Sequence, residues 1–250
     1  MDVSLHTVAV LGIVFLSILV RSTFGFGEAL IAMPLLALII DLKTAAPLVA
    51  IIAGTVTLII LVTNWHRVQF HSAWRLVASS FAGIPLGLIF LKGSYDVTMK
   101  VALAIVIIVF CIYSLMSPKL WVLKNEKFSY GFGFIAGILG GAYNTAGPPI
   151  VIYSSMRRWD PGAFRATLQG YFLPTWLFIM LGHGFSGLWT RSIWQLYLIS
   201  LPVLFVAFLI GNRLNRSIPA KSFHRYIHII LAGIGIFLFF RSIWGTFPVN

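Results

Sequence analysis

Residues 44–66, TAAPLVAIIAGTVTLIILVTNWH, contain no Asp, Glu, Lys or Arg. A helix needs ~20 apolar residues to cross the hydrocarbon core of a bilayer, so this segment is long enough to span it. Lipid offers no partner to backbone N–H and C=O groups, which only a helix or a closed barrel can pair internally. The period-2 alternation of barrel strands is missing. The segment therefore predicts a membrane-spanning helix.

Further stretches without charged side chains lie on both sides of this segment, at residues 3–20, 101–118, 128–156, 166–190 and 192–212. The chain is 59% hydrophobic and 10% charged, which lies outside the range of soluble domains. The fold class predicted is an all-α polytopic membrane protein. Ten hydrophobic elements are expected, at 3–20, 29–41, 44–64, 72–91, 98–117, 128–142, 147–157, 165–182, 191–212 and 222–242.

The net charge of +12 would suggest nucleic acid as the partner of a soluble protein. Here Lys and Arg lie in short connections between apolar segments, a pattern typical of membrane topology and contact with lipid headgroups. The expected partner is the lipid bilayer and not nucleic acid. Residues 1–5 carry Asp2 and no Lys or Arg, so no removable signal peptide is expected. The protein is predicted to be a multi-pass protein of the inner membrane.

The chain divides near its middle at residues 119–127, KLWVLKNEK, the longest polar-rich connection. We interpret residues 1–118 and 128–250 as two repeats joined by a linker, because long and short elements follow in the same order in both. A shift of 120 residues also superimposes identical residues. These pairs are Gly27 and Gly147, Ala46 and Ala166, Leu48 and Leu168, Ile59 and Ile179, Trp74 and Trp194, and Ser80 and Ser200.

Each repeat contains a break after its first element. Residues 21–28, RSTFGFGE, interrupt the first repeat, and residues 140–149, GGAYNTAGPP, interrupt the second. The elements that follow, 29–41 and 147–157, are too short to span a bilayer comfortably. Secondary transporters place their substrate sites at paired interruptions of this kind.

The loop charges favour a topology in which each broken pair returns to the side it came from. Lys and Arg then concentrate on one side, as the positive-inside rule requires of the cytoplasmic side, whereas a crossing pair dilutes the asymmetry. An odd number of crossings per repeat follows, so the repeats are predicted to be inverted, with a cytoplasmic linker and both termini outside the cytoplasm. The cytoplasmic set is Arg67, Arg75, Lys119, Lys124, Lys127, Arg157, Arg158, Arg165, Arg213, Arg216, Lys221 and Arg225, against Lys43, Lys92, Lys100, Arg191 and Arg241.

The two breaks can provide an anion site. Their glycines allow backbone to approach a ligand closely, and each following helix points free N–H groups and a positive dipole end at the break. The alternative is that these glycines and prolines are ordinary kinks and close-packing positions of membrane helices. The residues expected to bind a small anion are Gly25, Phe26, Gly27, Glu28, Tyr143, Asn144, Thr145, Ala146, Gly147 and Pro148.

Glu28 is one of six acidic residues, and the other five lie at predicted ends or loops. A carboxylate within the membrane is costly unless it is paired, protonated or hydrated, so Glu28 is a candidate proton-coupling group. The alternative is a structural ion pair with Arg21, seven residues earlier.

Other chemistry finds weaker support. The six histidines show no shared zinc spacing, and the single Cys111 excludes an intramolecular disulfide, so neither a metal nor a cofactor is expected. Gly184 to Gly187, GFSG, matches the short motif of rhomboid intramembrane proteases, with Ser186 as nucleophile and His228 as base. Leu231 stands where the rhomboid histidine motif has glycine, so a turn serine is the favoured interpretation. A membrane scaffold without transport is a third alternative.

At the two breaks the chain resembles the TauE/SafE family, whose signature is a Gly-rich stretch that runs into an apolar segment with an early proline. The matching segments are 25–36, GFGEALIAMPLL, and 140–151, GGAYNTAGPPIV. The resemblance implies export or uptake of sulfite, organosulfonates or related small anions across the cytoplasmic membrane. Many members have glycine where Glu28 stands, and a more glycine-rich stretch where Asn144 and Thr145 stand. Those departures imply a more polar, proton-linked site.

Overall fold

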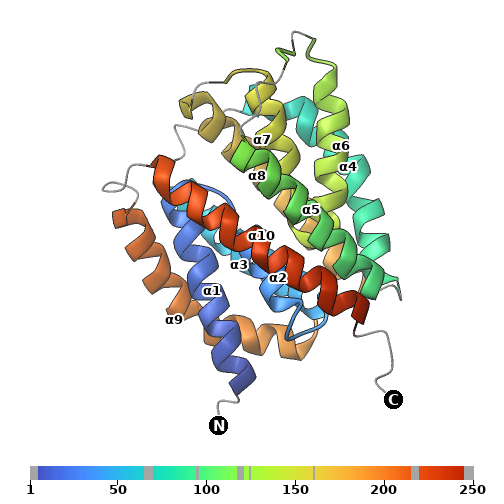
Figure 1. Cartoon of the computed structure of the whole chain (residues 1–250), viewed down its shortest axis with the longest axis vertical. Coiled ribbons are helices and arrows are strands. Elements are labelled where there is room, and N and C mark those ends of the chain that lie inside the picture. Colours follow the sequence, from blue (N-terminus) through green and yellow to red (C-terminus); the bar gives the residue numbers. More distant parts are fainter. Residues whose placement is uncertain are drawn as a thin grey trace. The chain divides into compact units, whose positions relative to one another are not determined.

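The computed structural model describes residues 5–64, 70–93, 96–116, 121–123, 125–159, 161–214 and 220–244 (Figure 1). Ten α-helices and no strand occur within these residues. The helices are α1 (Leu5–Phe24), α2 (Glu28–Leu36), α3 (Leu42–Asn64), α4 (Phe70–Lys92), α5 (Asp96–Met116), α6 (Phe128–Tyr143), α7 (Gly147–Met156), α8 (Pro161–Phe185), α9 (Arg191–Leu214) and α10 (Ala220–Trp244).

The ten predicted elements are confirmed, and the boundary that differs most from its prediction does so for a clear reason. The element predicted at 29–41 ends as a helix at Leu36, five residues early. Asp41 instead caps α3, because its carboxylate accepts hydrogen bonds from the backbone N–H of Thr44 at 2.6 Å and from the Thr44 hydroxyl at 3.1 Å. An N-cap aspartate starts a new helix, so the apolar run up to Ile40 divides into a helix and a turn.

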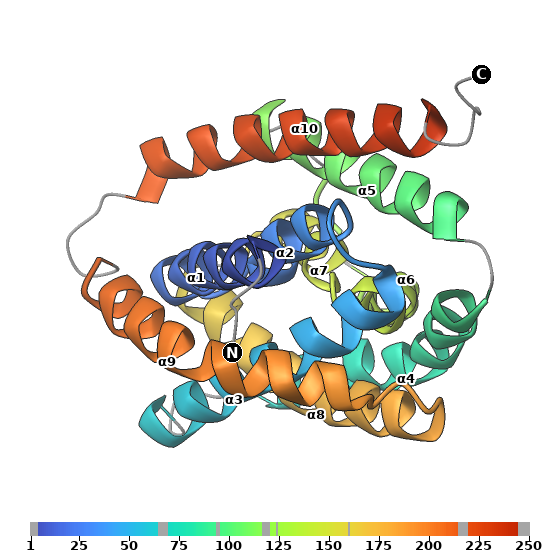
Figure 2. The ribbon, with the colours of Figure 1, turned by 90° about the horizontal axis from the view of Figure 1, so that it is seen from below.

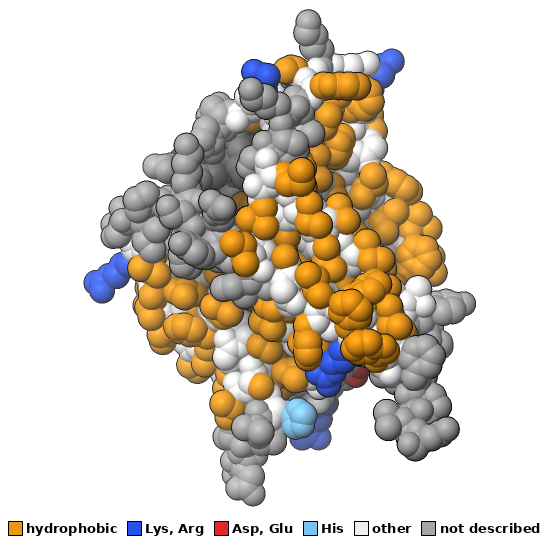
Figure 3. Space-filling model, in the orientation of Figure 1, with side chains coloured by type: hydrophobic (Ala, Val, Ile, Leu, Met, Phe, Trp, Pro, Cys, Tyr) orange, Lys and Arg blue, Asp and Glu red, His pale blue; other side chains and the backbone are white. Residues whose placement is uncertain are grey.

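The helix surfaces suit lipid. Five of the described helices are long and apolar enough to cross a membrane, namely α1, α3, α4, α5 and α9. Large apolar side chains point outward on them, for example Ile89 on α4 and Leu209 on α9, which are 65% and 62% exposed. Hydrophobic side chains cover most of the described surface in Figure 3, with few Lys and Arg. The chain is therefore a polytopic α-helical membrane protein, as predicted.

The helices gather into two compact units, each drawn from both predicted repeats. Unit 1 consists of Met1–Ala45, Gly93–Pro118 and Gln195–Asn250, and unit 2 of Ala46–Lys92 and Lys119–Trp194. The order of a long helix, a short helix and three long helices occurs twice, in α1–α5 and again in α6–α10. The inversion of the two repeats stays a prediction.

In unit 1, α2 packs against α1, α5 and α10, and α10 lies alongside α5 (Figure 2). Helix α9 approaches α1 closely at Gly211, where an added Cβ would lie 2.7 Å from the carbonyl oxygen of Leu19. The hydroxyl of Thr23 in α1 donates to the carbonyl of Leu19 within its own helix at 2.7 Å. The short helix α2 is thus enclosed by longer helices, and seven of its nine residues are buried.

In unit 2, the centre is a close contact between α4 and α6 that depends on glycine. A Cβ on Gly137 would lie 2.4 Å from the carbonyl oxygen of Ser80, and one on Gly87 would lie 2.2 Å from that of Ile138. The contact residues recur every four positions, so they form one stripe on each helix, and such small-residue stripes let membrane helices approach to backbone contact. The stripes consist of Gly83 and Gly87 on α4 and of Gly133, Gly137 and Gly141 on α6.

A buried polar cluster joins a third helix to this pair. The Ser80 hydroxyl of α4 donates to the carbonyl of Gly133 in α6 at 2.6 Å, and it lies 2.8 Å from the hydroxyl of Tyr171 in α8. Ser80 and Tyr171 are both fully buried. Because the two hydroxyl groups are hydrogen-bonded to neighbouring helices, the cluster fixes how the three helices are rotated about their axes.

The glycine stripe predicts that Gly137→Ala destabilises the protein by about 1–3 kcal/mol, because the new methyl group overlaps the backbone of α4 and forces the helices apart. Thermal unfolding of the purified protein in detergent measures this. The matched control is Gly131→Ala in the same helix, where an added Cβ meets nothing within 4 Å. Equal melting temperatures for the two variants would contradict the packing role.

Candidate functional site

The first break, in unit 1, is a left-handed turn between α1 and α2. Gly25 has φ +88° and donates its N–H to the carbonyl of Arg21 at 2.6 Å, which ends α1. Gly27 has φ +102° and is the N-cap of α2. Both φ values lie where L side chains are disfavoured, so the backbone conformation explains the glycines here.

The second break, in unit 2, ends α6 at a left-handed cap residue. Asn144 has φ 56°, and its N–H donates to the carbonyl of Gly140 at 2.8 Å, while the N–H of Thr145 donates to that of Leu139 at 3.2 Å. Asparagine tolerates this conformation better than most residues with a Cβ. Helix α7 begins three residues later, at Gly147.

The two breaks share one geometry. In each, a helix ends at a left-handed residue, Gly25 or Asn144, and a short buried helix begins three positions on, at Glu28 or Gly147. Each short helix is too brief to span a bilayer. The paired interruptions predicted from sequence are therefore present, one in each compact unit.

Arg21 and Glu28 form an ion pair across the first break, through Nη1 of Arg21 and Oε1 of Glu28. The Arg21 side chain is 1% exposed and the Glu28 side chain 14% exposed. Glu28 also occupies the first turn of α2, where the helix dipole favours a carboxylate. The ion pair with Arg21, which was the alternative expected for Glu28, is thus formed. The role of Glu28 in proton coupling stays a prediction.

In the second break, the two polar side chains contact backbone within unit 2. The side-chain amide of Asn144 donates to the carbonyl of Ala46 in α3 at 2.7 Å. The hydroxyl of Thr145, a buried residue, lies 3.5 Å from the carbonyl of Leu139. Asn144 therefore attaches the break to α3. Every residue has a backbone carbonyl, so the sequence alone could not indicate that the Asn144 amide bonds to that of Ala46.

The N-termini of α2 and α7 differ in their supply of donors. The first N–H groups of a helix have no intrahelical acceptor, so α2 presents those of Glu28 and Ala29 at its break. Helix α7 has Pro148 and Pro149 in its first turn, and proline has no N–H. The first break thus offers more backbone donors to an anion, and the second offers mainly the N–H of Gly147.

The other nominated residues lie in ordinary structural settings. Ser186 follows α8 in a turn, where its N–H donates to the carbonyl of Gly182 at 3.0 Å and Gly187 has φ +69°. The His228 ring packs against Phe110, with centroids 5.7 Å apart. No cluster of three or more His, Cys, Asp or Glu side chains suited to a metal occurs in the described part of the chain.

The linker is attached to the end of α7 by charges that the sequence suggested only as topology signals. Glu126 pairs with Arg75 of α4, and it lies 3.3 Å from Nη2 of Arg157, the C-cap residue of α7. Arg157 also donates to the carbonyl of Leu123 at 2.9 Å. The three groups have no regular spacing in the sequence, so only the fold brings them together.

Comparison with known proteins gives a consistent picture. The family model described as "Sulfite exporter TauE/SafE" matches residues 10–238. The curated "Probable sulfite/organosulfonate exporter TauE" of Cupriavidus necator is 25% identical over 207 residues, which cover 78% of this chain and 80% of that protein. No solved structure matches the chain. The family match spans both breaks and nearly all the helices, and so this chain belongs to the TauE/SafE family.

Proposed function

We propose that the protein is a secondary transporter of small anions in the inner membrane, with sulfite or organosulfonates as substrates. The observation that supports this most is the family match across residues 10–238, together with a relative named as a probable sulfite/organosulfonate exporter. The paired breaks support it independently, because discontinuous helices with inward-pointing N-termini bind anionic groups in transporters. The loop charges favour a cytoplasmic linker at 119–127.

Purified protein in liposomes tests the function directly. We expect labelled sulfite to accumulate by exchange in vesicles preloaded with sulfite or with a short sulfonate, and not in vesicles preloaded with an equal concentration of a carboxylate. Protein-free vesicles provide the control for leakage. Exchange that is no faster than in protein-free vesicles for any of these anions would contradict the transporter proposal.

We propose that the breaks bind the anion, with backbone donors at Gly27 in the first break and at Gly147 in the second. Gly27→Val places an L side chain at φ +102°, although the nearest side-chain atom to an added Cβ is 3.8 Å away. The variant therefore distorts the break without overpacking it. Gly147→Val puts a β-branched residue in a helix directly before Pro148, which disfavours the helical conformation.

We predict that each of these two variants lowers the initial rate of anion exchange at least tenfold while the protein remains folded in the membrane. The control is Gly12→Ala in α1, where an added Cβ meets nothing within 4 Å. Exchange rates and the elution profile in detergent are compared for all three. An exchange rate equal to that of the wild type in both valine variants would show that the breaks do not bind the anion.

The ion pair in the first break offers a route to proton coupling. While Glu28 is ionised, its charge neutralises that of Arg21 and repels an anion. Protonation of Glu28 would leave the Arg21 guanidinium as an uncompensated cation at the N-terminus of α2, an environment that attracts an anion. Proton binding and anion binding then favour each other, and the coupling is reciprocal.

We predict that Glu28→Gln, which mimics the protonated carboxyl group, retains anion exchange but loses its acceleration by a pH gradient. Exchange without a gradient and uptake driven by a gradient are measured in the same vesicle preparation. Full gradient-driven uptake in the variant would exclude Glu28 as the coupling group.

A purely structural role makes a different prediction. Removing one partner of a buried ion pair costs about 3–5 kcal/mol, so Glu28→Gln would then be unstable and Arg21→Gln with Glu28→Gln would regain stability. If the double variant folds normally and retains gradient-driven uptake, the ion pair has a structural role only.

A further inference from the structure

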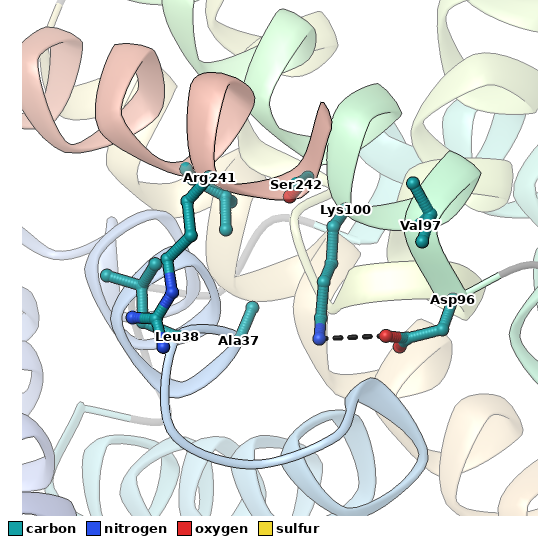
Figure 4. A pocket seen from close by; sticks show the side chains of 8 residues that line it. Ala37, Leu38, Asp96, Val97, Lys100, Arg241 and Ser242 are labelled. Carbon is teal, nitrogen blue, oxygen red and sulfur yellow. Dashed lines mark ion pairs between the residues drawn. The ribbon is translucent and has the colours of Figure 1, made fainter. Parts of the chain in front are cut away.

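A cavity within unit 1 combines charges that neither break contains. It has a volume of about 200 Å³ and lies among the end of α2, the first turn of α5 and the last turn of α10. Figure 4 shows the side chains that line it. Its lining consists of Ala37, Leu38, Asp96, Val97, Lys100, Leu238, Arg241 and Ser242.

Two of these side chains are cationic and one is acidic. Lys100 pairs with Asp96 at 2.8 Å within α5, so their charges largely compensate each other. Arg241 extends from α10 toward Leu38 (Figure 4), and no ion pair of Arg241 occurs among the described residues. The described side chains that line the cavity therefore carry a net charge of +1.

The helix ends reduce this charge without cancelling it. The last carbonyls of α2, near Ala37 and Leu38, and those of α10 each carry a partial negative charge of roughly half an elementary charge, and the first turn of α5 carries a partial positive charge of similar size. An arginine whose only role was to compensate the charge of these carbonyls would not require a cavity beside it. Here the guanidinium borders a space that exceeds the ~10–15 Å³ a single water requires, so the space can hold a small anion together with water.

We propose that this cavity binds a small tetrahedral or pyramidal oxyanion, with Arg241 as its principal cation and Lys100 as the second. Both are in the group of basic residues that the loop charges place outside the cytoplasm. The cavity is thus a second anion-binding site, on that side of the membrane, and none of its lining residues belongs to either break. The inference that the bound anion is also the transported one rests on the proposed function. The inference that the cavity binds an oxyanion does not.

The test uses chemical protection and needs no transport. Val97 lines the cavity and is 40% exposed, so Val97→Cys places a reactive thiol in it. The probe is sulfate, which does not react with thiols, and the readout is the rate of labelling by a neutral methanethiosulfonate. We expect sulfate to slow labelling several-fold in a saturable way in nanodiscs of phosphatidylcholine. The parent protein, whose Cys111 is buried, gives the background rate.

Charge variants on the Val97→Cys background should act in opposite directions. Arg241→Gln should raise the sulfate concentration that gives half protection at least tenfold, and Lys100→Gln should raise it less. Asp96→Asn should lower this concentration, because it removes the only carboxylate among the described residues of the lining. Lys92→Gln in the last turn of α4 removes an equal charge outside the cavity and should leave protection unchanged.

A lipid headgroup phosphate carries the same chemistry, and a second nanodisc composition distinguishes it. Slower labelling in discs that contain phosphatidylglycerol, with no effect of sulfate in either composition, would assign the cavity to lipid and overturn the proposal. Sulfate protection that is absent, or equal in Arg241→Gln and Lys92→Gln, would also overturn it. Protection without sulfite exchange in liposomes would keep the site and reject the transport function.

Discussion

A backbone N–H or C=O group without a partner costs several kcal/mol in the hydrocarbon core, and this cost determines which elements the chain can form. The ten helices of the described residues follow from it, because only a helix pairs these groups within one segment. The same cost determines how the helices can stop. At Gly25 and Asn144 the chain ends a helix with a left-handed residue, whose N–H returns to the preceding turn. At Ala46 a carbonyl receives the amide of Asn144. Each break is thus supported by hydrogen bonds inside its own unit.

Once the helices exist, side-chain size determines how they pack. Lipid is as apolar as leucine, so water exclusion does little to hold two membrane helices together, and close contact must come from shape. The glycine stripes of α4 and α6 bring the two backbones into contact, and Ser80 adds a hydrogen bond to Gly133 at that contact. Valine or leucine at these positions would be equally apolar and would still be excluded by its volume.

The sequence predicted the helices well because lipid makes hydropathy a direct signal of secondary structure. It also located both breaks, since Gly25, Gly27 and Pro148 disrupt a helix by their own chemistry. It could not predict that Asn144 uses its amide to hold α3, because a backbone carbonyl can belong to any residue. Lys100 and Arg241 were interpreted only as topology signals, and Asp96 only as an acidic residue at a predicted end or loop. The ion pair of Asp96 with Lys100 and the approach of α10 to it were not predicted, and the approach of α10 arises only from tertiary packing.

The division into two units has a consequence for how the protein is made. Unit 2 ends at Trp194, so the ribosome has supplied all its segments before Gln195–Asn250 is translated. Unit 1 begins with Met1–Ala45 but is completed only by Gln195–Asn250. Helices α1, α2 and α5, with the Arg21–Glu28 pair among them, must therefore stay in the membrane without α9 and α10 until synthesis is nearly finished. The buried ion pair, whose two partners lie seven residues apart, can form during that interval, and it neutralises both charges while the surrounding helices are still to come.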